Sequence, residues 1–216
     1  MVTTRREQKV RVISGSARGR ALKAVPGMGT RPTTDKVKEA IFSMIGPYFD
    51  GGYALDLFAG TGGLGIEALS RGMSQAVFID MEFKSIDTVK SNLKQTGFTD
   101  QAEVYKNDAE RAIKALAKRD MKFDLVFLDP PYKLKHGDKL ILTMEELGLI
   151  GEDTVIVLEY ESSYTYPEKI GSFEEGRKAV YGETTVSIYR YEAAGQIAEE
   201  PEDEVGTETG DKEKWK

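Results

Sequence analysis

The sequence predicts an α/β fold whose core is a mostly parallel, seven-stranded sheet that ends in an antiparallel hairpin. Through the middle of the chain, short apolar segments alternate with segments of helical character, a succession typical of strands joined by right-handed crossovers. Near the C-terminal end, two β-rich segments, 177–181 and 184–191, are separated only by the turn Gly182-Glu183. This spacing predicts an antiparallel pair at one edge of the sheet.

Local patterns predict the remaining elements in order. Residues 10–14 and 20–24 are expected to form two short strands around a turn with two glycines. Residues 33–35 cap a helix that runs to about residue 47 and carries one apolar stripe. The parallel strands are expected at Tyr53, Gln75, Ala102, Phe123 and Thr154, with helices near Gly63, Phe83, Ala109 and Lys139.

A glycine-rich loop follows the strand predicted at residues 53–58. Gly60, Gly62 and Gly65 have the spacing G-x-G-x-x-G, and glycine allows positive φ angles and close approach of the backbone to a ligand. A short helix follows and ends at Gly72. Strand, glycine turn and helix predict a nucleotide-type site, although this spacing alone also fits dinucleotide enzymes.

Two carboxylates favour another cofactor over a dinucleotide. Asp56 lies at the end of the first parallel strand, where it can receive an ammonium group but would repel a pyrophosphate. Asp80 ends the next strand and suits the two hydroxyls of an adenosine ribose. S-adenosylmethionine has an ammonium group, a carboxylate and a ribose but no phosphate, so it fits this pattern better.

The run Asp129-Pro130-Pro131-Tyr132 closes an apolar strand predicted at residues 123–128. The prolines stop the strand, so a carboxylate, a rigid carbonyl and an aromatic ring are held together. The amine of a flat base has two N–H donors for Asp129 and the Pro130 carbonyl, and a ring face on which Tyr132 can stack. The run therefore predicts chemistry at a base amine, with a plain strand-to-loop exit as the alternative.

The composition indicates one α/β domain. The chain has 216 residues, 40% of them hydrophobic, with no apolar run of membrane-spanning length and no signal-peptide pattern. It has no cysteine and one histidine, so neither disulfides nor thiolate or histidine metal sites are expected. We expect a cytoplasmic protein that binds neither metal nor membrane.

The formal net charge of −6 conceals a polarity along the chain. Residues 1–40 carry ten Lys and Arg against three acidic residues, whereas residues 193–216 carry three Lys against eight. The ten are Arg5, Arg6, Lys9, Arg11, Arg18, Arg20, Lys23, Arg31, Lys36 and Lys38. They predict a basic arm suited to phosphates, with a merely solvated charge run as the alternative. The acidic tail has few apolar residues and is expected to be disordered.

Several stretches of the chain match a known family. They are Val12-Ile13-Ser14-Gly15, Arg18-Gly19-Arg20-Ala21-Leu22, residues 31–42, residues 56–62, Asp129-Pro130-Pro131-Tyr132 and Glu159 at the end of the fifth strand. Together they resemble the bacterial RsmD family of 16S ribosomal RNA guanine-N2 methyltransferases, from about residue 10 to residue 192. Class I methyltransferases share the glycine loop and many amine methyltransferases the Asp-Pro-Pro-Tyr run, whereas the arginine-containing stretches are more specific.

The resemblance implies a fold, an activity and a division of the chain. The fold is the Rossmann-like class I S-adenosylmethionine-dependent methyltransferase fold with a small N-terminal β-hairpin extension. Residues 1–30 would form the basic arm and hairpin, 31–192 the methyltransferase domain, and 193–216 the tail. The implied reaction is methylation of the N2 amine of guanine 966 in 16S ribosomal RNA, either as RNA of the small subunit or in the assembling 30S particle.

The resemblance also assigns roles to individual residues. The catalytic residues would be Asp129, Pro130, Pro131 and Tyr132. The cofactor would contact Asp56, Phe58, Ala59, Gly60, Thr61, Gly62, Asp80, Glu82, Asp108 and Asp129. The RNA would contact Arg11, Arg18, Arg20, Arg31, Thr33, Lys133 and Lys135. Asp80 stands where relatives often have glutamate, so Glu82 can share the ribose, and Asp108 can meet the adenine amine, cap a helix, or do both.

Three other functions share parts of this pattern. An adenine-N6 nucleic-acid methyltransferase would use the same amine chemistry, but the DNA enzymes normally need a target-recognition segment that this compact chain lacks. A protein-glutamine methyltransferase uses a similar tetrapeptide, usually beginning with Asn, and has less need of a basic arm. A non-catalytic RNA-binding module for ribosome assembly would not need both loops intact.

Overall fold

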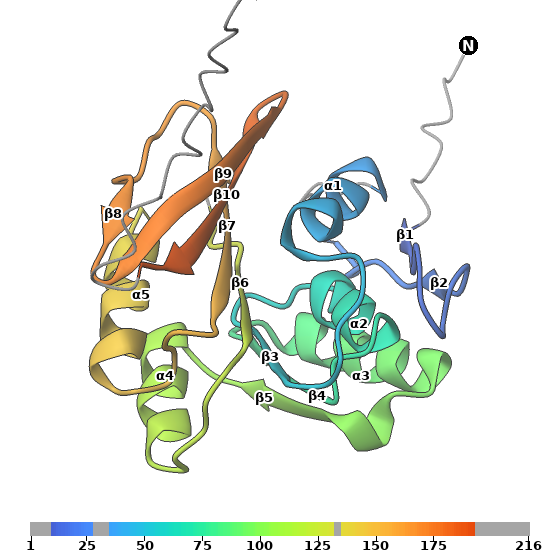
Figure 1. The fold of residues 1–216 in the computed structure, drawn as a ribbon. Coiled ribbons are helices and arrows are strands. Elements are labelled where there is room, and N and C mark those ends of the chain that lie inside the picture. The colour runs from blue at the N-terminus through green and yellow to red at the C-terminus, as the bar shows by residue number, and fades with distance from the viewer. Residues whose placement is uncertain (1–9, 28–34, 132–134, 193–216) are drawn as a thin grey trace, which may run out of the picture.

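The computed structural model describes residues 10–27, 35–131 and 135–192, and its centre is a twisted eight-stranded sheet (Figure 1). The strands lie in the order β5-β4-β3-β6-β7-β10-β9-β8. Their bounds are Tyr53–Asp56 (β3), Gln75–Asp80 (β4), Ala102–Lys106 (β5), Leu125–Leu128 (β6), Val155–Glu161 (β7), Lys169–Ile170 (β8), Phe173–Tyr181 (β9) and Thr184–Tyr191 (β10). β3 to β7 pair in parallel, whereas β10 pairs antiparallel with both β7 and β9. The predicted parallel sheet with an antiparallel end is confirmed.

The antiparallel end is larger than the sequence predicts. β9 begins at Phe173, which pairs with Tyr191 of β10. The first half of β9 is polar, and it joins the sheet because of this pairing with β10. β8 adds an eighth strand of two residues, too short for a sequence pattern to reveal. β7 continues two residues beyond the predicted end at Glu159.

Helices cover both faces of the sheet and bury two hydrophobic clusters. The helices are α1 (Asp35–Ile45), α2 (Gly63–Ser70), α3 (Phe83–Thr96), α4 (Ala109–Ala117) and α5 (Gly137–Glu146), with a short 3-10 helix, η1 (Thr99–Gln101). One cluster joins α1, α2 and α3 to the sheet, and the other joins α4 and α5 to it, as their separation in Figure 1 shows. Within the described ranges, no helix is long and apolar enough to cross a membrane.

The N-terminal hairpin packs against the body of the molecule. Its strands are β1 (Val10–Arg11) and β2 (Ala21–Leu22), and buried hairpin side chains, Val12 among them, belong to the cluster of α1 to α3. Both strands are shorter than predicted. The backbone N–H groups of Ile13 and Ser14 donate to the carboxylate of Glu67 in α2 and are not used in strand pairing.

A buried ionic cluster joins this hairpin to two helices. Glu67 is fully buried and forms ion pairs with Arg71 Nε (2.8 Å) and Lys38 Nζ (3.4 Å), while Lys38 also donates to the carbonyl of Arg11. Burial lowers the pKa of Lys38, and the neighbouring Glu67 opposes that shift. Counting Lys38 with the RNA-facing charge of the arm is therefore wrong, because its ammonium group is used inside the protein.

Candidate active site

Three carboxylates meet at the carboxyl edge of the parallel strands. Asp56 is the last residue of β3, Asp80 is the last residue of β4, and Asp129 directly follows β6. β3 lies between β4 and β6, so the three side chains come from neighbouring strands. Ligands of open α/β sheets bind outside this edge. The fold thus brings together the acids that the sequence assigned to the cofactor and to the amine.

The loop between β3 and α2 needs glycine for two different reasons. Gly60 (φ 52°) and Gly62 (φ 75°) have left-handed backbone conformations. A Cβ atom added to Gly60 would meet no atom within 4 Å, so the space beside this part of the loop is open. Gly65 lies in α2, where an added Cβ would be 2.4 Å from Cε1 of Phe78. Gly65 therefore permits close packing of α2 on β4.

Hydrogen bonds fasten the same loop to the sheet. The N–H of Ala59 donates to the carbonyl of Ile79 (2.9 Å), and the N–H of Gly62 donates to the carbonyl of Ala59 (2.6 Å). Phe58 is half-buried against the cluster of α4 and α5. Thr61 is half-buried, and its carbonyl accepts a hydrogen bond from a helix side chain. Hydrogen bonds to β4 on one side and from α3 on the other thus hold the loop in one conformation.

Asp80 connects the glycine loop to the start of α3. Its Oδ2 accepts the N–H of Gly60 (2.8 Å), and its Oδ1 accepts the N–H of Glu82 (2.8 Å). The side chain of Glu82 is exposed at the N-terminal end of α3 and makes no capping bond there. Of the two candidate ribose carboxylates, Asp80 is the one in direct contact with the loop.

Burial dominates the electrostatics of Asp56 and Asp129. Asp56 is 3% exposed, and its Oδ2 accepts the N–H of Gly65 (3.1 Å). Loss of water raises the pKa of Asp56 to about 7; the bond from Gly65 lowers it, and the charges of Asp129 and Asp80 raise it. Burial likewise raises the pKa of Asp129 to about 7. Both carboxyls therefore keep their protons to a higher pH than an ordinary aspartate does.

The charges of the site fit a cationic ligand. The side chains whose charges shift the pKa of Asp56 are two further carboxylates, Asp129 and Asp80. A cation among them would stabilise their ionised forms. S-adenosylmethionine carries a positive ammonium group and a positive sulfonium, and its ribose hydroxyls need acceptors, so it matches this donor set. In the described part of the chain, no group of three or more His, Asp or Glu side chains is arranged to hold a metal ion.

Asp108 caps helix α4. Its Oδ1 accepts the N–H groups of Glu110 (3.1 Å) and Arg111 (3.3 Å) at the start of that helix. The residue is exposed, and the cap does not use its Oδ2 atom. The capping alternative is confirmed, and the adenine contact stays a prediction.

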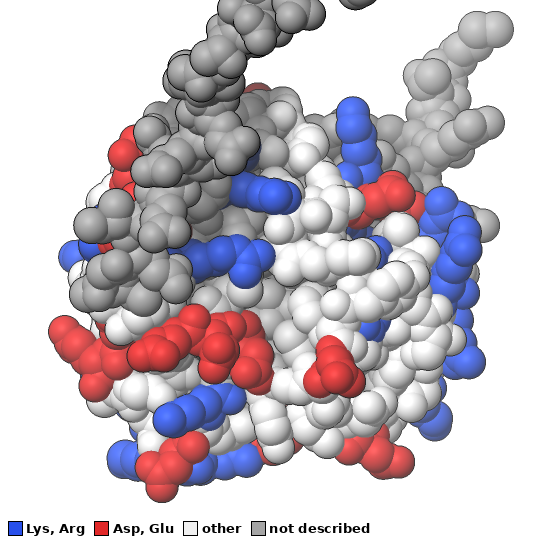
Figure 2. Space-filling model, in the orientation of Figure 1, with Lys and Arg blue, Asp and Glu red and all other residues white. Residues whose placement is uncertain are grey.

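The hairpin arginines of the predicted RNA surface are exposed. Figure 2 shows Lys and Arg side chains along the edge that carries β1 and β2 in Figure 1. Arg11 forms an ion pair with Asp35 (2.8 Å), and Arg20 donates to the carbonyl of Gln95 (2.9 Å). Arg18 is exposed as well. These residues are available at the surface of the hairpin.

Other predicted site residues lie around the end of β6. Pro130, which follows Asp129, is buried, and Pro131 is exposed. Lys135 is exposed, and its Nζ lies 4.9 Å from the ring centroid of Tyr164. Four predicted residues lie outside the described residues: Arg31, Thr33, Tyr132 and Lys133.

One residue that the sequence analysis missed links the hairpin to the glycine loop. Asn92 of α3 is fully buried, and its Nδ2 donates to the carbonyls of Thr61 (2.9 Å) and Lys23 (3.1 Å). Its Oδ1 accepts the N–H of Lys23 (2.8 Å). A polar residue on the apolar face of a helix was the available signal, because buried amides need hydrogen-bond partners.

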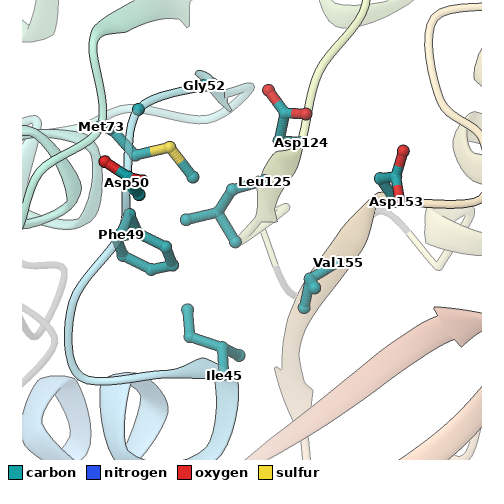
Figure 3. Close-up of a pocket in the computed structure, with 10 residues that line it drawn as sticks. Ile45, Phe49, Asp50, Gly52, Met73, Asp124, Leu125, Asp153 and Val155 are labelled. Carbon is teal, nitrogen blue, oxygen red and sulfur yellow. The ribbon is translucent and has the colours of Figure 1, made fainter.

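A separate pocket of about 310 Å³ opens at the opposite edge of the sheet (Figure 3). Leu125 and Val155, the first residues of β6 and β7, line it together with Asp124 and Asp153. The carboxylates of the candidate site follow the last residues of their strands. The pocket is therefore not part of the candidate site.

Comparison with known proteins shows to which family the chain belongs. The family model described as Conserved hypothetical protein 95 matches residues 10–190. Over 188 residues the chain is 31% identical to "Ribosomal RNA small subunit methyltransferase D" of Escherichia coli strain K12, a match that covers 87% of this chain and 93% of that protein. The chain belongs to the RsmD family.

Other relatives agree with membership of the RsmD family. The chain is 57% identical over 181 residues to "Putative rRNA methyltransferase YlbH" of Bacillus subtilis strain 168, covering 84% of this chain and 98% of that protein. A solved structure, "Putative methyltransferase yhhF from Escherichia coli", has a TM-score of 0.71 and 34% identity, covering 86% of this chain and 99% of that one. The family stretch, 10–190, includes the hairpin as well as the three carboxylates.

Proposed function

We propose that this chain is an S-adenosylmethionine-dependent methyltransferase that acts on the N2 amine of guanine 966 in small-subunit ribosomal RNA. The observation that carries the proposal is the position of Asp129 and Pro130 beside the two cofactor carboxylates, Asp56 and Asp80, in a member of the RsmD family. The partner is that RNA or the assembling 30S particle. A cytoplasmic location, where such particles assemble, belongs to the same proposal.

The glycine loop and two carboxylates would hold the cofactor. When bound, S-adenosylmethionine supplies an electrophilic methyl group on a positively charged sulfur. Asp56 receives the ammonium group. Asp80 accepts the ribose hydroxyls, because each of its oxygens accepts one backbone N–H and has capacity for a further donor. The left-handed conformations of Gly60 and Gly62 let the backbone approach the ligand closely.

Asp129 and Pro130 would orient the target amine. The carboxylate of Asp129 accepts one N–H and the carbonyl of Pro130 accepts the other, which turns the nitrogen lone pair towards the methyl group. Such orientation can contribute about 7–11 kcal/mol in favourable cases. Once methylated, the nitrogen is acidic, and Asp129 is placed to take the proton. Burial raises the pKa of Asp129, which makes its carboxylate a better proton acceptor than that of an ordinary aspartate.

The RNA would be held by surfaces on both sides of this site. Arg11, Arg18 and Arg20 of the hairpin are exposed and suited to phosphate oxygens, as is Lys135 after the Asp-Pro-Pro-Tyr run. The target base leaves its stack, which costs a few kcal/mol, and stacks on Tyr132. Sequence choice follows from contacts to the unstacked base and its neighbours.

The decisive experiment is transfer of a labelled methyl group in vitro. Purified protein is incubated with labelled S-adenosylmethionine and either naked 16S RNA or 30S particles from cells that lack the enzyme, and the RNA is digested to nucleosides. We expect label in N2-methylguanosine, at guanine 966. Label in N6-methyladenosine would assign the adenine reaction. RNA binding without transfer to either substrate would assign the non-catalytic assembly module.

A further inference from the structure

Glu159 lies beside Asp129, on the next strand of the sheet. β6 and β7 are parallel, and Leu128 is the partner of Leu158. Asp129 follows Leu128, and Glu159 follows Leu158. The backbones of Asp129 and Glu159 therefore lie side by side just beyond this last pair. Neighbouring strands are about 4.8 Å apart. β7 continues to Glu161 after β6 has ended, so Glu159 borders the place where the chain turns out of the sheet.

The alternation of side chains places Glu159 on the same face as the other acids. Phe127 and Val157 belong to the cluster of α1 to α3, whereas Leu128 and Leu158 belong to the cluster of α4 and α5. Successive side chains of a strand point to opposite faces. Glu159 therefore shares the face of Val157, as its partner residue Val186 on β10 does.

The acids of the candidate site lie on that face too. Asp56 follows Leu55, which belongs to the cluster of α4 and α5, so Asp56 points to the opposite side. The charge of Asp129 acts on Asp56, which places these two carboxylates close together. Glu159 is 8% exposed, so its carboxylate is largely screened from water. A fourth carboxylate thus lies next to the amine-binding pair, Asp129 and the Pro130 carbonyl.

We propose that Glu159 selects guanine by accepting a hydrogen bond from its ring N1–H. This inference rests on the proposed function and deepens it. In guanine the N1–H donor adjoins the N2 amine, so a base held by Asp129 presents N1–H on the same edge. Adenine carries an unprotonated N1 beside its amine, and two acceptors would then face each other. A site that presents an acceptor to an N–H strongly rejects analogues that have an acceptor at that position, because the two acceptors repel each other.

The test changes both partners of the proposed hydrogen bond: the acceptor on the enzyme, which is the carboxylate of Glu159, and the donor on the base, which is the N1–H of guanine. Particles are reconstituted with guanine or with 2-aminopurine at the target position. 2-Aminopurine keeps the 2-amine but has an acceptor at N1. The wild-type protein should prefer guanine by roughly tenfold to a hundredfold in single-turnover rate. Glu159→Gln offers an amide N–H to that acceptor, so the preference should fall by roughly the same factor, with 2-aminopurine gaining relative to guanine.

Three controls separate specificity from folding and from the chemistry itself. Glu159→Asp keeps the carboxylate and should keep the preference for guanine. Asp129→Asn should slow both substrates by similar factors, because both carry the amine. Binding of S-adenosylhomocysteine should be the same in the wild type and in Glu159→Gln.

Two outcomes would overturn the inference. One is a wild-type protein that methylates both bases at equal rates, and the other is a preference for guanine that Glu159→Gln leaves unchanged, whether both rates fall equally or neither falls. If instead the wild-type protein made no N2-methylguanosine on guanine-containing particles, the proposed function itself would be at fault.

Discussion

Asp56 and Asp129 come from neighbouring strands, and their carboxyls lie close enough for the charge of one to act on the other. Burial raises the pKa of each carboxyl to about 7, and the charge of Asp129 adds to the shift of Asp56. A folded protein with such groups binds protons that an ordinary aspartate has already lost. A cation that enters the site favours the ionised forms, so its binding releases protons. The release of protons on binding therefore depends on the positive charge of the ligand that enters the site.

The first prediction concerns the pH dependence of cofactor binding. S-adenosylmethionine differs from S-adenosylhomocysteine by the positive charge of the sulfonium, which only ionised carboxylates attract. The ratio of their affinities should therefore rise in favour of S-adenosylmethionine as pH increases through about 7. Calorimetry measures both affinities, at pH values kept below those at which the amino group of either compound loses its proton. Asp129→Asn should flatten the rise, and a constant ratio in the wild type would contradict it.

The second prediction concerns the amine acceptor. Asp129→Ala removes one partner of the target N–H while Pro130 stays in place. Loss of one preorganised polar partner in a catalytic site typically costs about 2.7–4 kcal/mol, so single-turnover transfer should fall by roughly a hundredfold to a thousandfold. Asp153→Ala is the matched control, because Asp153 is exposed at the opposite edge of the sheet, and its rate should equal that of the wild type. Near-normal turnover in Asp129→Ala would remove Asp129 from the mechanism.

The third prediction concerns the link between hairpin and loop. Asn92→Ala leaves the carbonyl of Thr61 and the backbone of Lys23 without their buried partner. Unfolding free energy should fall by about 2–3 kcal/mol, and S-adenosylhomocysteine should bind several-fold more weakly because the loop loses its support. Denaturant unfolding and calorimetry measure the two effects. Gln95→Ala also removes a contact to the hairpin, but this side chain is exposed and should cost about 0.5 kcal/mol or less. Equal effects of the two substitutions would contradict the special role of Asn92.

The fourth prediction concerns the hairpin as an RNA surface. Arg18→Gln should weaken RNA binding and reduce the slope of log affinity against log salt by about 1, because one phosphate contact is lost. Affinity for S-adenosylhomocysteine should not change. Lys118→Gln removes an equal charge at the end of α4, on the other face of the sheet, and should leave the slope as in the wild type. An unchanged slope in Arg18→Gln would make the hairpin charge a solvated surface only.

Much of the fold was predictable because its signals are local. A few consecutive residues specify each of three features: the strand before the glycine loop, the Gly60-x-Gly62 turn and the Pro-Pro stop after Asp129. Backbone sterics restrict the conformation of such short segments wherever they occur. The order of strands and helices then implies a parallel sheet, whose carboxyl ends meet at one edge. The sequence alone therefore predicted that Asp56, Asp80 and Asp129 belong to one site.

The sequence could not predict contacts between residues that lie far apart along the chain. Lys38 looks like part of a basic arm, yet it is buried against Glu67, 29 residues away. Asn92 stands out as a polar residue on the apolar face of its helix, but the sequence does not show that it joins Thr61 to Lys23 across separations of 31 and 69 residues. Glu159 lies beside Asp129 only because β7 pairs with β6 in one register. A buried polar group must find its partner in space, so only the tertiary structure determined which of these side chains stabilise the fold and which line the site.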